Sequence, residues 1–432
     1  MNVLGIAYQP LPAILHAISP ETQIATGGWL QGAADIICRH KDICLTYCFQ
    51  GKKQCQGTVD GIAYYSICEA EVVRSRDILK YREKDYIRFK QIIDSCNPDV
   101  IQIFGTETWF QRQFVFMLDK MNLLDRTVVW IQGLAGFCAQ NFSNGITQKM
   151  ARRKTLWELL RGTNISGIKK RLEINGISEK KAVKKIKNVF VRTDWDQACC
   201  KAFNPSLNFY FCNETLRPGF YEDDIWGLNK IELHSIFMSQ YGTPIKGYHQ
   251  MLRAMPIILQ EFPDAILYCT GKDLLKGDNS CMEKLREPSY LRMLREEICS
   301  HSLENNVRFL GVLQEKDMRN QYLKSHVFVS ASVIENSPNS IAEAMILGVP
   351  IVASDVGGVS SMLTHKEDGY LYPFDEYALL AEYICRIFRD DSVACEFSEK
   401  GREKALNRHD QEKNYGDLLD AYRTIIGCCQ EE

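Results

Sequence analysis

Two glutamates, Glu335 and Glu343, bracket the predicted start of a helix in the second half of the chain. Ser337 and Pro338 predict that start, because serine caps helices and proline at the first helical position has no N–H to leave unpaired. A helix N-terminus attracts anions through its unpaired N–H groups and its partial positive charge. Carboxylates beside it can hold neutral hydroxyl groups. The combination suits a ligand with both a diphosphate and sugar hydroxyls, as a nucleotide-sugar has.

Short apolar strands must position this run. Residues 327–330 form one predicted strand before it, and residues 351–354 form another after it. Along the whole chain such strands alternate with helical patterns, which predicts parallel sheets built from β-α-β units. The expected fold class is α/β, with two doubly wound, Rossmann-like domains and an interdomain cleft. Ligands of such sheets bind beyond the carboxyl ends of the strands.

The run from Glu335 to Gly358 resembles the donor-binding signature of retaining glycosyltransferases of family 4, which adopt the GT-B fold. The resemblance covers the second half of the chain almost continuously and the first half more loosely. It implies a hexosyltransferase that moves a sugar from a nucleotide-sugar to a hydroxyl acceptor with retention. It also implies that Glu335 contacts the transferred sugar and Glu343 holds the ribose. Asn336 and Ser337 would offer backbone N–H groups to phosphate.

Other positions match the family's donor side. Lys246 resembles the lysine of the family's Lys-Gly pair, which implies a contact with the donor phosphates and a catalytic role. Many relatives also carry an arginine a few residues earlier, and residues 239–245 contain none. Gly27 and Gly28 are similar to the N-terminal glycine loop, where backbone without side chains lets a sugar diphosphate approach closely.

The acceptor side is matched more weakly. Gln132 ends a predicted strand at a place where many relatives have a histidine, so a histidine base is not expected here. Arg192 and Asp194 end another strand and are candidates for acceptor contacts. The alternative for Asp194 is that it caps the helix that follows.

A chain of 432 residues is too long for one ordinary core. The pattern breaks at Pro218 and at the acidic residues beside Asp223, which predicts a linker. We expect an acceptor-side domain, a nucleotide-sugar-binding domain and a C-terminal helix, over residues 1–220, 221–408 and 409–432. In the resembled fold such a helix packs back on the first domain.

Neither a cofactor nor a metal is expected. We find no Asp-x-Asp motif between strands in a position to hold a cation, and Asp223-Asp224 lies in the predicted linker. Cys38, His40, Cys44 and Cys48 are close in sequence, but their spacing fits no standard zinc site and core packing is the favoured interpretation. The net charge of -2 does not recruit nucleic acid, and the 17 scattered cysteines are typical of reduced thiols in a cytoplasmic protein.

Residues 149–187 form the one strongly polarised stretch, with 13 lysines and arginines against three glutamates. Trp157 and several leucines interleave with them. Such a stretch attracts the anionic inner face of a membrane, and a solvated helix pair is the equal alternative. The membrane interpretation predicts a peripheral enzyme whose acceptor is a saccharide or lipid-linked saccharide of bacterial envelope polysaccharide or capsule synthesis.

Two other classes of function remain open. One is a GT-B-type epimerase or phosphorylase, which acts without a sugar acceptor or requires inorganic phosphate. The other is a non-catalytic GT-B subunit that binds nucleotide-sugar and supports a partner.

Overall fold

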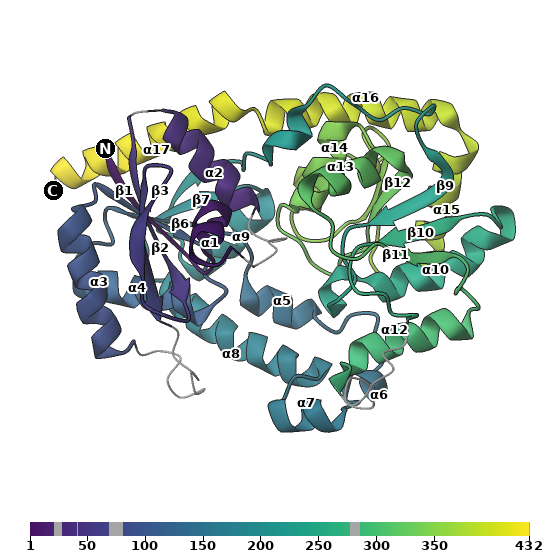
Figure 1. The fold of residues 1–432 in the computed structure, drawn as a ribbon, viewed down its shortest axis with the longest axis horizontal. Helices are drawn as coiled ribbons and strands as arrows, with labels where there is room; N and C mark the ends of the chain where they lie inside the picture. The colour runs from purple at the N-terminus through teal and green to yellow at the C-terminus, as the bar shows by residue number, and fades with distance from the viewer. Residues whose placement is uncertain (21–27, 41, 69–80, 277–285, 432) are drawn as a thin grey trace. The chain divides into compact units, whose positions relative to one another are not determined.

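The computed structural model describes residues 1–20, 28–40, 42–68, 81–276 and 286–431, and Figure 1 traces the fold. The chain divides into two compact units. Unit 1 consists of Met1–Gly136, Glu173–Arg217 and His409–Glu432, and unit 2 consists of Phe137–Leu172 and Pro218–Arg408. None of the helices in the described ranges has both the length and the hydropathy of a bilayer-spanning segment.

Unit 1 is built on a sheet with the strand order β3-β4-β2-β1-β5-β6-β7-β8. The strands are β1 (Asn2–Ala7), β2 (Cys44–Gly51), β3 (Gln56–Val59), β4 (Ile62–Cys68), β5 (Val100–Phe104), β6 (Thr127–Trp130), β7 (Asn188–Val191) and β8 (Asn208–Phe211). Neighbours are parallel except β3 and β4, so the expected doubly wound sheet is confirmed. The sequence did not predict β3, because this edge strand is mostly exposed and has no apolar alternation.

Helices cover both faces of this sheet and include the C-terminal segment. They are α1 (Pro12–Ile18), α2 (Gly28–Arg39), α3 (Glu83–Cys96), α4 (Trp109–Lys120), α9 (Asp194–Phe203) and α17 (Gln411–Glu431). Leu418, Tyr422 and Ile425 of α17 belong to the same apolar core as β1 and β5. His409 Nδ1 also lies 2.8 Å from the carbonyl oxygen of Glu214. The segment His409–Glu432 is thus part of unit 1.

Unit 2 has a fully parallel sheet with the order β11-β10-β9-β12-β13-β14. Its strands are β9 (Glu232–Met238), β10 (Ile266–Cys269), β11 (Val307–Phe309), β12 (Ser325–Ser330), β13 (Ile351–Ser354) and β14 (Tyr370–Tyr372). Its helices include α10 (Tyr248–Glu261), α12 (Ser289–Ser300), α13 (Glu315–Lys324), α14 (Asn339–Leu347), α15 (Tyr377–Arg389) and α16 (Asp391–Arg408). The strand order reverses between β9 and β12, which is where open sheets of this kind bind ligands.

The segment Phe137–Leu172 belongs to unit 2, although the sequence placed it inside the first domain. It contains α6 (Gln148–Ala151) and α7 (Leu156–Arg161), while α5 (Ala135–Asn141) and α8 (Ile165–Val183) cross the boundary. His249 of α10 lies 3.1 Å from the carbonyl oxygen of Asn144, and Arg253 donates to that of Gly145 at 2.8 Å. Burial lowers the pKa of His249 to about 3, so this histidine is neutral at ordinary pH. The chain passes from unit 1 to unit 2 at Arg217–Pro218, close to the boundary predicted at residue 220, so only the assignment of Phe137–Leu172 differs from the prediction.

Candidate functional site

The predicted strand–helix–strand arrangement around Glu335 is confirmed in unit 2. β12 ends at Ser330, a loop carries Glu335, and α14 leads through Gly348 into β13. Gly348 closes the helix with a φ of 78°, a left-handed conformation that glycine adopts without strain. Glu335 therefore lies at the carboxyl end of the sheet, beside the switch point.

The helix begins later than the sequence predicted. Pro338 is the N-cap and Asn339 is the first helical residue. Ser337 is not the cap, and its hydroxyl instead lies 3.6 Å from Met362 Sδ. The N–H groups of Asn339 and Ser340 belong to the first turn of α14, where backbone N–H groups have no acceptor inside the helix. The phosphate contacts expected of the Asn336 and Ser337 backbone stay a prediction, and the N–H groups of Asn339 and Ser340 join them as candidate anion-binding donors.

Glu335 and Lys246, the two residues predicted to carry catalysis, lie in direct contact. Lys246 Nζ is 2.7 Å from Glu335 Oε1, and Ser332 Oγ donates to the same oxygen at 2.8 Å. Lys246 ends a short 3-10 turn, Pro244–Lys246, that follows β9. The ion pair therefore bridges the carboxyl ends of β9 and β12. Both side chains are partly buried, which strengthens their attraction relative to a fully solvated pair.

Two glycines allow the loops around this ion pair to approach closely. A Cβ at Gly247, whose φ is 65°, would lie 1.6 Å from the carbonyl oxygen of Ala331. A Cβ at Gly357, whose φ is 55°, would lie 1.9 Å from the carbonyl oxygen of Glu335. Gly358 N donates to that same oxygen at 3.0 Å. Only glycine fits such positions, so the Lys-Gly and Gly-Gly pairs of the sequence shape the site through the backbone.

Space at the ion pair is limited. The pocket beside it has a volume of about 10 Å³, enough for about one water molecule. Its lining includes Lys246, Glu335, Gln240, Ser330 and Ser332.

The other residues predicted on the donor side are either buried in unit 2 or belong to the N-terminal part of the chain. Glu343 is inside α14 and is 8% exposed, and Asn336 and Ser337 are buried as well. Gly28 is the first residue of α2 in unit 1. Gly27 lies outside the described residues.

Arg192 was expected on the acceptor side, and the structure corrects this. Its Nη1 is 2.5 Å from Glu214 Oε1, and both side chains are 3% exposed. Its Nη2 donates to the carbonyl oxygens of Ile131 and Gln132 at 3.1 and 3.2 Å. Arg192 therefore has a structural role inside unit 1. Gln132 itself is half-buried just after β6.

Asp194 is exposed at the first position of α9. The alternative that it caps this helix is wrong. Thr193 is the N-cap, and its hydroxyl accepts from Asp196 N at 3.2 Å. The carboxylate of Asp194 is thus an exposed group beside a helix start, and its acceptor role stays a prediction.

Replacing Arg192 with alanine is expected to lower the free energy of unfolding by about 3–5 kcal/mol, because Glu214 would keep a buried charge without its partner. Urea denaturation of the variant and the wild type measures this. Lys201→Ala, which removes an exposed cation from the same unit, is the control and should change little. A loss below about 1 kcal/mol for Arg192→Ala would contradict the structural assignment.

Unit 1 also holds a polar cluster that the sequence did not predict, just beyond β5. Glu107 accepts from Thr106 N at 3.0 Å, and Thr106 Oγ1 donates to Glu179 at 2.8 Å. Burial raises the pKa of Glu107, and burial together with the charge of Glu107 raises that of Glu179 to about 8. Arg112, fully buried, donates to the carbonyl oxygens of Thr106 and Glu107. The signal in the sequence was Gly105-Thr-Glu directly after an apolar strand, where open sheets place functional groups.

Metal-ligating side chains do not gather into a site of three or more within the described ranges. Asp224 of the acidic linker is engaged by Lys230 at 2.6 Å. His40 stacks on Tyr415, Cys48 is buried and Cys44 is exposed, so these residues do not converge on one point.

Comparisons with known proteins place the site in a family context. Residues 224–404 match the family described as Glycosyl transferases group 1. The phosphatidyl-myo-inositol mannosyltransferase of Mycobacterium leprae is 26% identical over 191 residues, which cover 44% of this chain and 46% of that relative. The match thus spans about half the length of this relative, and the same holds for the Mycolicibacterium smegmatis phosphatidyl-myo-inositol mannosyltransferase and the Bacillus subtilis spore coat protein SA.

Solved structures resemble the fold over nearly its full length. Sucrose-phosphate synthase from Thermosynechococcus elongatus gives a TM-score of 0.73 at 15% identity, covering 99% of this chain and all of that one. Anabaena HepE in complex with UDP-glucose gives a TM-score of 0.64 at 15% identity, with both chains fully covered. At such low identity these likenesses establish the fold alone.

Proposed function

Because residues 224–404 form a Glycosyl transferases group 1 domain in a chain with the GT-B fold, we propose that the protein is a retaining hexosyltransferase that uses a nucleotide-sugar. The observation that carries the proposal is the Lys246–Glu335 ion pair at the start of α14. A cation, two helix-opening N–H groups and a carboxylate converge where a sugar diphosphate would lie.

Each of these groups has a role in the proposed reaction. The diphosphate takes Lys246 and the N–H groups of Asn339 and Ser340, and these stabilise the negative charge that develops as the glycosidic bond breaks. Glu335, released from the lysine, contacts the transferred sugar. Glu343 holds the ribose. The acceptor hydroxyl attacks from the face of the departing diphosphate, which assists proton removal, so the anomeric configuration is retained. No metal takes part in the proposed reaction.

The acceptor proposed is a saccharide or lipid-linked saccharide of envelope polysaccharide or capsule synthesis, at the cytoplasmic face of a membrane. The M. leprae relative is named for a phospholipid, phosphatidyl-myo-inositol. The basic residues of 149–187 support peripheral attachment to an anionic surface. HepE, in complex with UDP-glucose, supports a nucleoside diphosphate sugar as donor.

A panel of nucleotide-sugars tested for thermal stabilisation identifies the donor. Incubation of that donor with saccharide and lipid-linked acceptors, followed by NMR of the product's anomeric carbon, then tests transfer with retention. Reaction without any acceptor would favour an epimerase, and a requirement for inorganic phosphate would favour a phosphorylase. Donor binding without turnover, even with lipid extracts, would favour a non-catalytic subunit.

Glu343→Ala is expected to weaken binding of the nucleotide-sugar by about tenfold or more, since each lost hydrogen bond to a charged group is worth about 1.5–3 kcal/mol. Turnover at saturating donor should change less, because the ribose is remote from the reacting bond. Isothermal titration with the stabilising donor measures the effect. Glu399→Ala, which removes an exposed carboxylate from α16, is the control. Equal affinities in all three proteins would refute the assignment.

A further inference from the structure

Helix α7 presents its apolar side chains to solvent. Leu156, Leu159 and Leu160 are 70%, 60% and 81% exposed, and their spacing places them on one face of the helix. Glu158, in contrast, is buried. An exposed apolar face on a short helix is unusual for a surface that meets only water.

The orientation of α7 is fixed from its buried side. Glu158 Oε1 accepts from the backbone N–H of Ser289 at 2.9 Å and from its hydroxyl at 3.0 Å, at the start of α12. Its other oxygen closes a capping box with Thr155. Turning the leucines inward would break these charge-assisted hydrogen bonds. The exposed leucines are therefore a built feature of unit 2.

Exposed cations flank α7 along the chain. Arg152, Lys154 and Arg161 are exposed on or beside α7, and Lys170 and Arg171 follow in the same unit. The guanidinium of Arg161 lies 4.1 Å from the ring centroid of Trp157, and that of Arg286 lies 5.1 Å from it.

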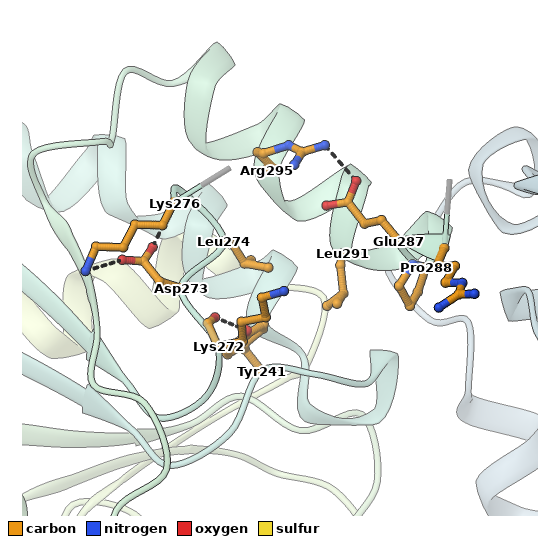
Figure 2. Close-up of a pocket in the computed structure, with 10 residues that line it drawn as sticks. Tyr241, Lys272, Asp273, Leu274, Lys276, Glu287, Pro288, Leu291 and Arg295 are labelled. Carbon is orange, nitrogen blue, oxygen red and sulfur yellow. Dashed lines mark hydrogen bonds and ion pairs between the residues drawn. The ribbon is translucent and has the colours of Figure 1, made fainter. Parts of the chain in front are cut away.

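Arg286 also lines a pocket of about 340 Å³ next to α12 (Figure 2). Its described charged lining consists of Lys272, Lys276, Arg286, Arg295, Asp273 and Glu287, four cations against two carboxylates. Each carboxylate is matched by one of these cations: Glu287 lies 2.7 Å from Arg295, and Asp273 lies 3.6 Å from Lys276 and also accepts from two backbone N–H groups of its own turn. The pocket therefore has a surplus of positive charge beside the leucine face.

We propose that the α7 leucine face and this pocket together form a docking surface for an anionic lipid bilayer. The leucines enter the boundary of the acyl chains, and the pocket cations and the basic residues around α7 bind lipid phosphates. Apolar insertion with a basic surround is the combination that binds such interfaces. The proposal deepens the membrane-borne acceptor proposed above and rests on it for its purpose, but it can be tested without any sugar transfer.

Sedimentation with vesicles tests the surface. The wild type is expected to pellet at low salt with phosphatidylglycerol–phosphatidylcholine vesicles and to stay in solution with pure phosphatidylcholine. The affinity of Leu156→Ser/Leu159→Ser/Leu160→Ser for the anionic vesicles should fall by about tenfold or more. The affinity of Lys276→Ala/Arg295→Ala for the same vesicles should fall by about fivefold or more. Leu233→Ser/Leu406→Ser removes two exposed leucines elsewhere in unit 2 and should bind like the wild type.

Failure of the docking surface is distinguishable from failure of the proposed function. All variants should keep the wild-type stabilisation by nucleotide-sugar, which also shows that they fold. Undiminished vesicle binding by the leucine variant, or no pelleting of the wild type, overturns the docking surface whatever the transferase assay finds. A wild-type dimer that the leucine variant converts to monomer in sedimentation velocity would assign the surface to a second copy of the chain, and would overturn it too. Normal vesicle binding without sugar transfer would count against the transferase alone.

Discussion

Glu335→Gln is expected to lower turnover about 100- to 1,000-fold while binding of the free nucleoside diphosphate stays equal or becomes tighter. In the structure Glu335 Oε1 lies 2.7 Å from Lys246 Nζ. A donor diphosphate must therefore compete with Glu335 for the lysine. The neutral amide competes less well for the lysine, so the anion binds at least as well. A contact to the reacting sugar acts on the transition state, so its loss appears in turnover. Isothermal titration and steady-state kinetics measure the two effects separately.

Glu399→Gln provides the matched control, because it neutralises an exposed carboxylate on α16 in the same unit. The control should behave like the wild type in both measurements. Weaker diphosphate binding in Glu335→Gln, with unchanged turnover, would reverse the roles given to the two partners of the ion pair.

Lys246→Ala is expected to reduce turnover by about 100- to 1,000-fold, the usual cost of removing one preorganised group that stabilises developing charge. The loss should be severe because residues 239–245 hold no arginine to share the leaving diphosphate. Nucleoside diphosphate binding should weaken in parallel and become less sensitive to salt. Wild-type activity should persist in a chelator, because the lysine and the helix start carry the charge.

Lys316→Ala, which removes an exposed lysine from α13, controls for a general loss of positive charge. Near-wild-type turnover of Lys246→Ala would remove the lysine from the mechanism. Complete loss of wild-type activity in chelator, restored by magnesium, would assign the leaving-group charge to a metal instead.

Several features of the site could be predicted from sequence because they are local. The alternation of apolar strands with helical patterns predicted two parallel sheets, since periodicity reflects which face of each element is buried. Gly348 and the Lys-Gly pair predicted backbone conformations that glycine alone adopts easily, and Gly247 has a φ of 65°. The helix start was placed too early. Ser337 and Pro338 are both good starting residues, and the contact of Ser337 with Met362 lies 25 positions away in sequence.

By itself, then, the sequence determined the α/β class and the strand–helix–strand unit that carries Glu335. The pairing of Glu335 with Lys246 appeared only in the tertiary structure. Only the tertiary structure decided which of the other predicted side chains are exposed and which are buried in ion pairs. Arg192 looked accessible at a strand end, but Glu214, which follows it in unit 1, pairs with it, and both charges are buried. The sequence left residues 149–187 open between a membrane-facing stretch and a solvated helix pair, and the hydrogen bonds of Glu158 to Ser289, 131 positions away, fix the α7 leucines toward solvent. Hydrogen bonds between such distant residues leave no periodic pattern in either segment, so the fate of these charges and leucines depends on the packing of the whole unit.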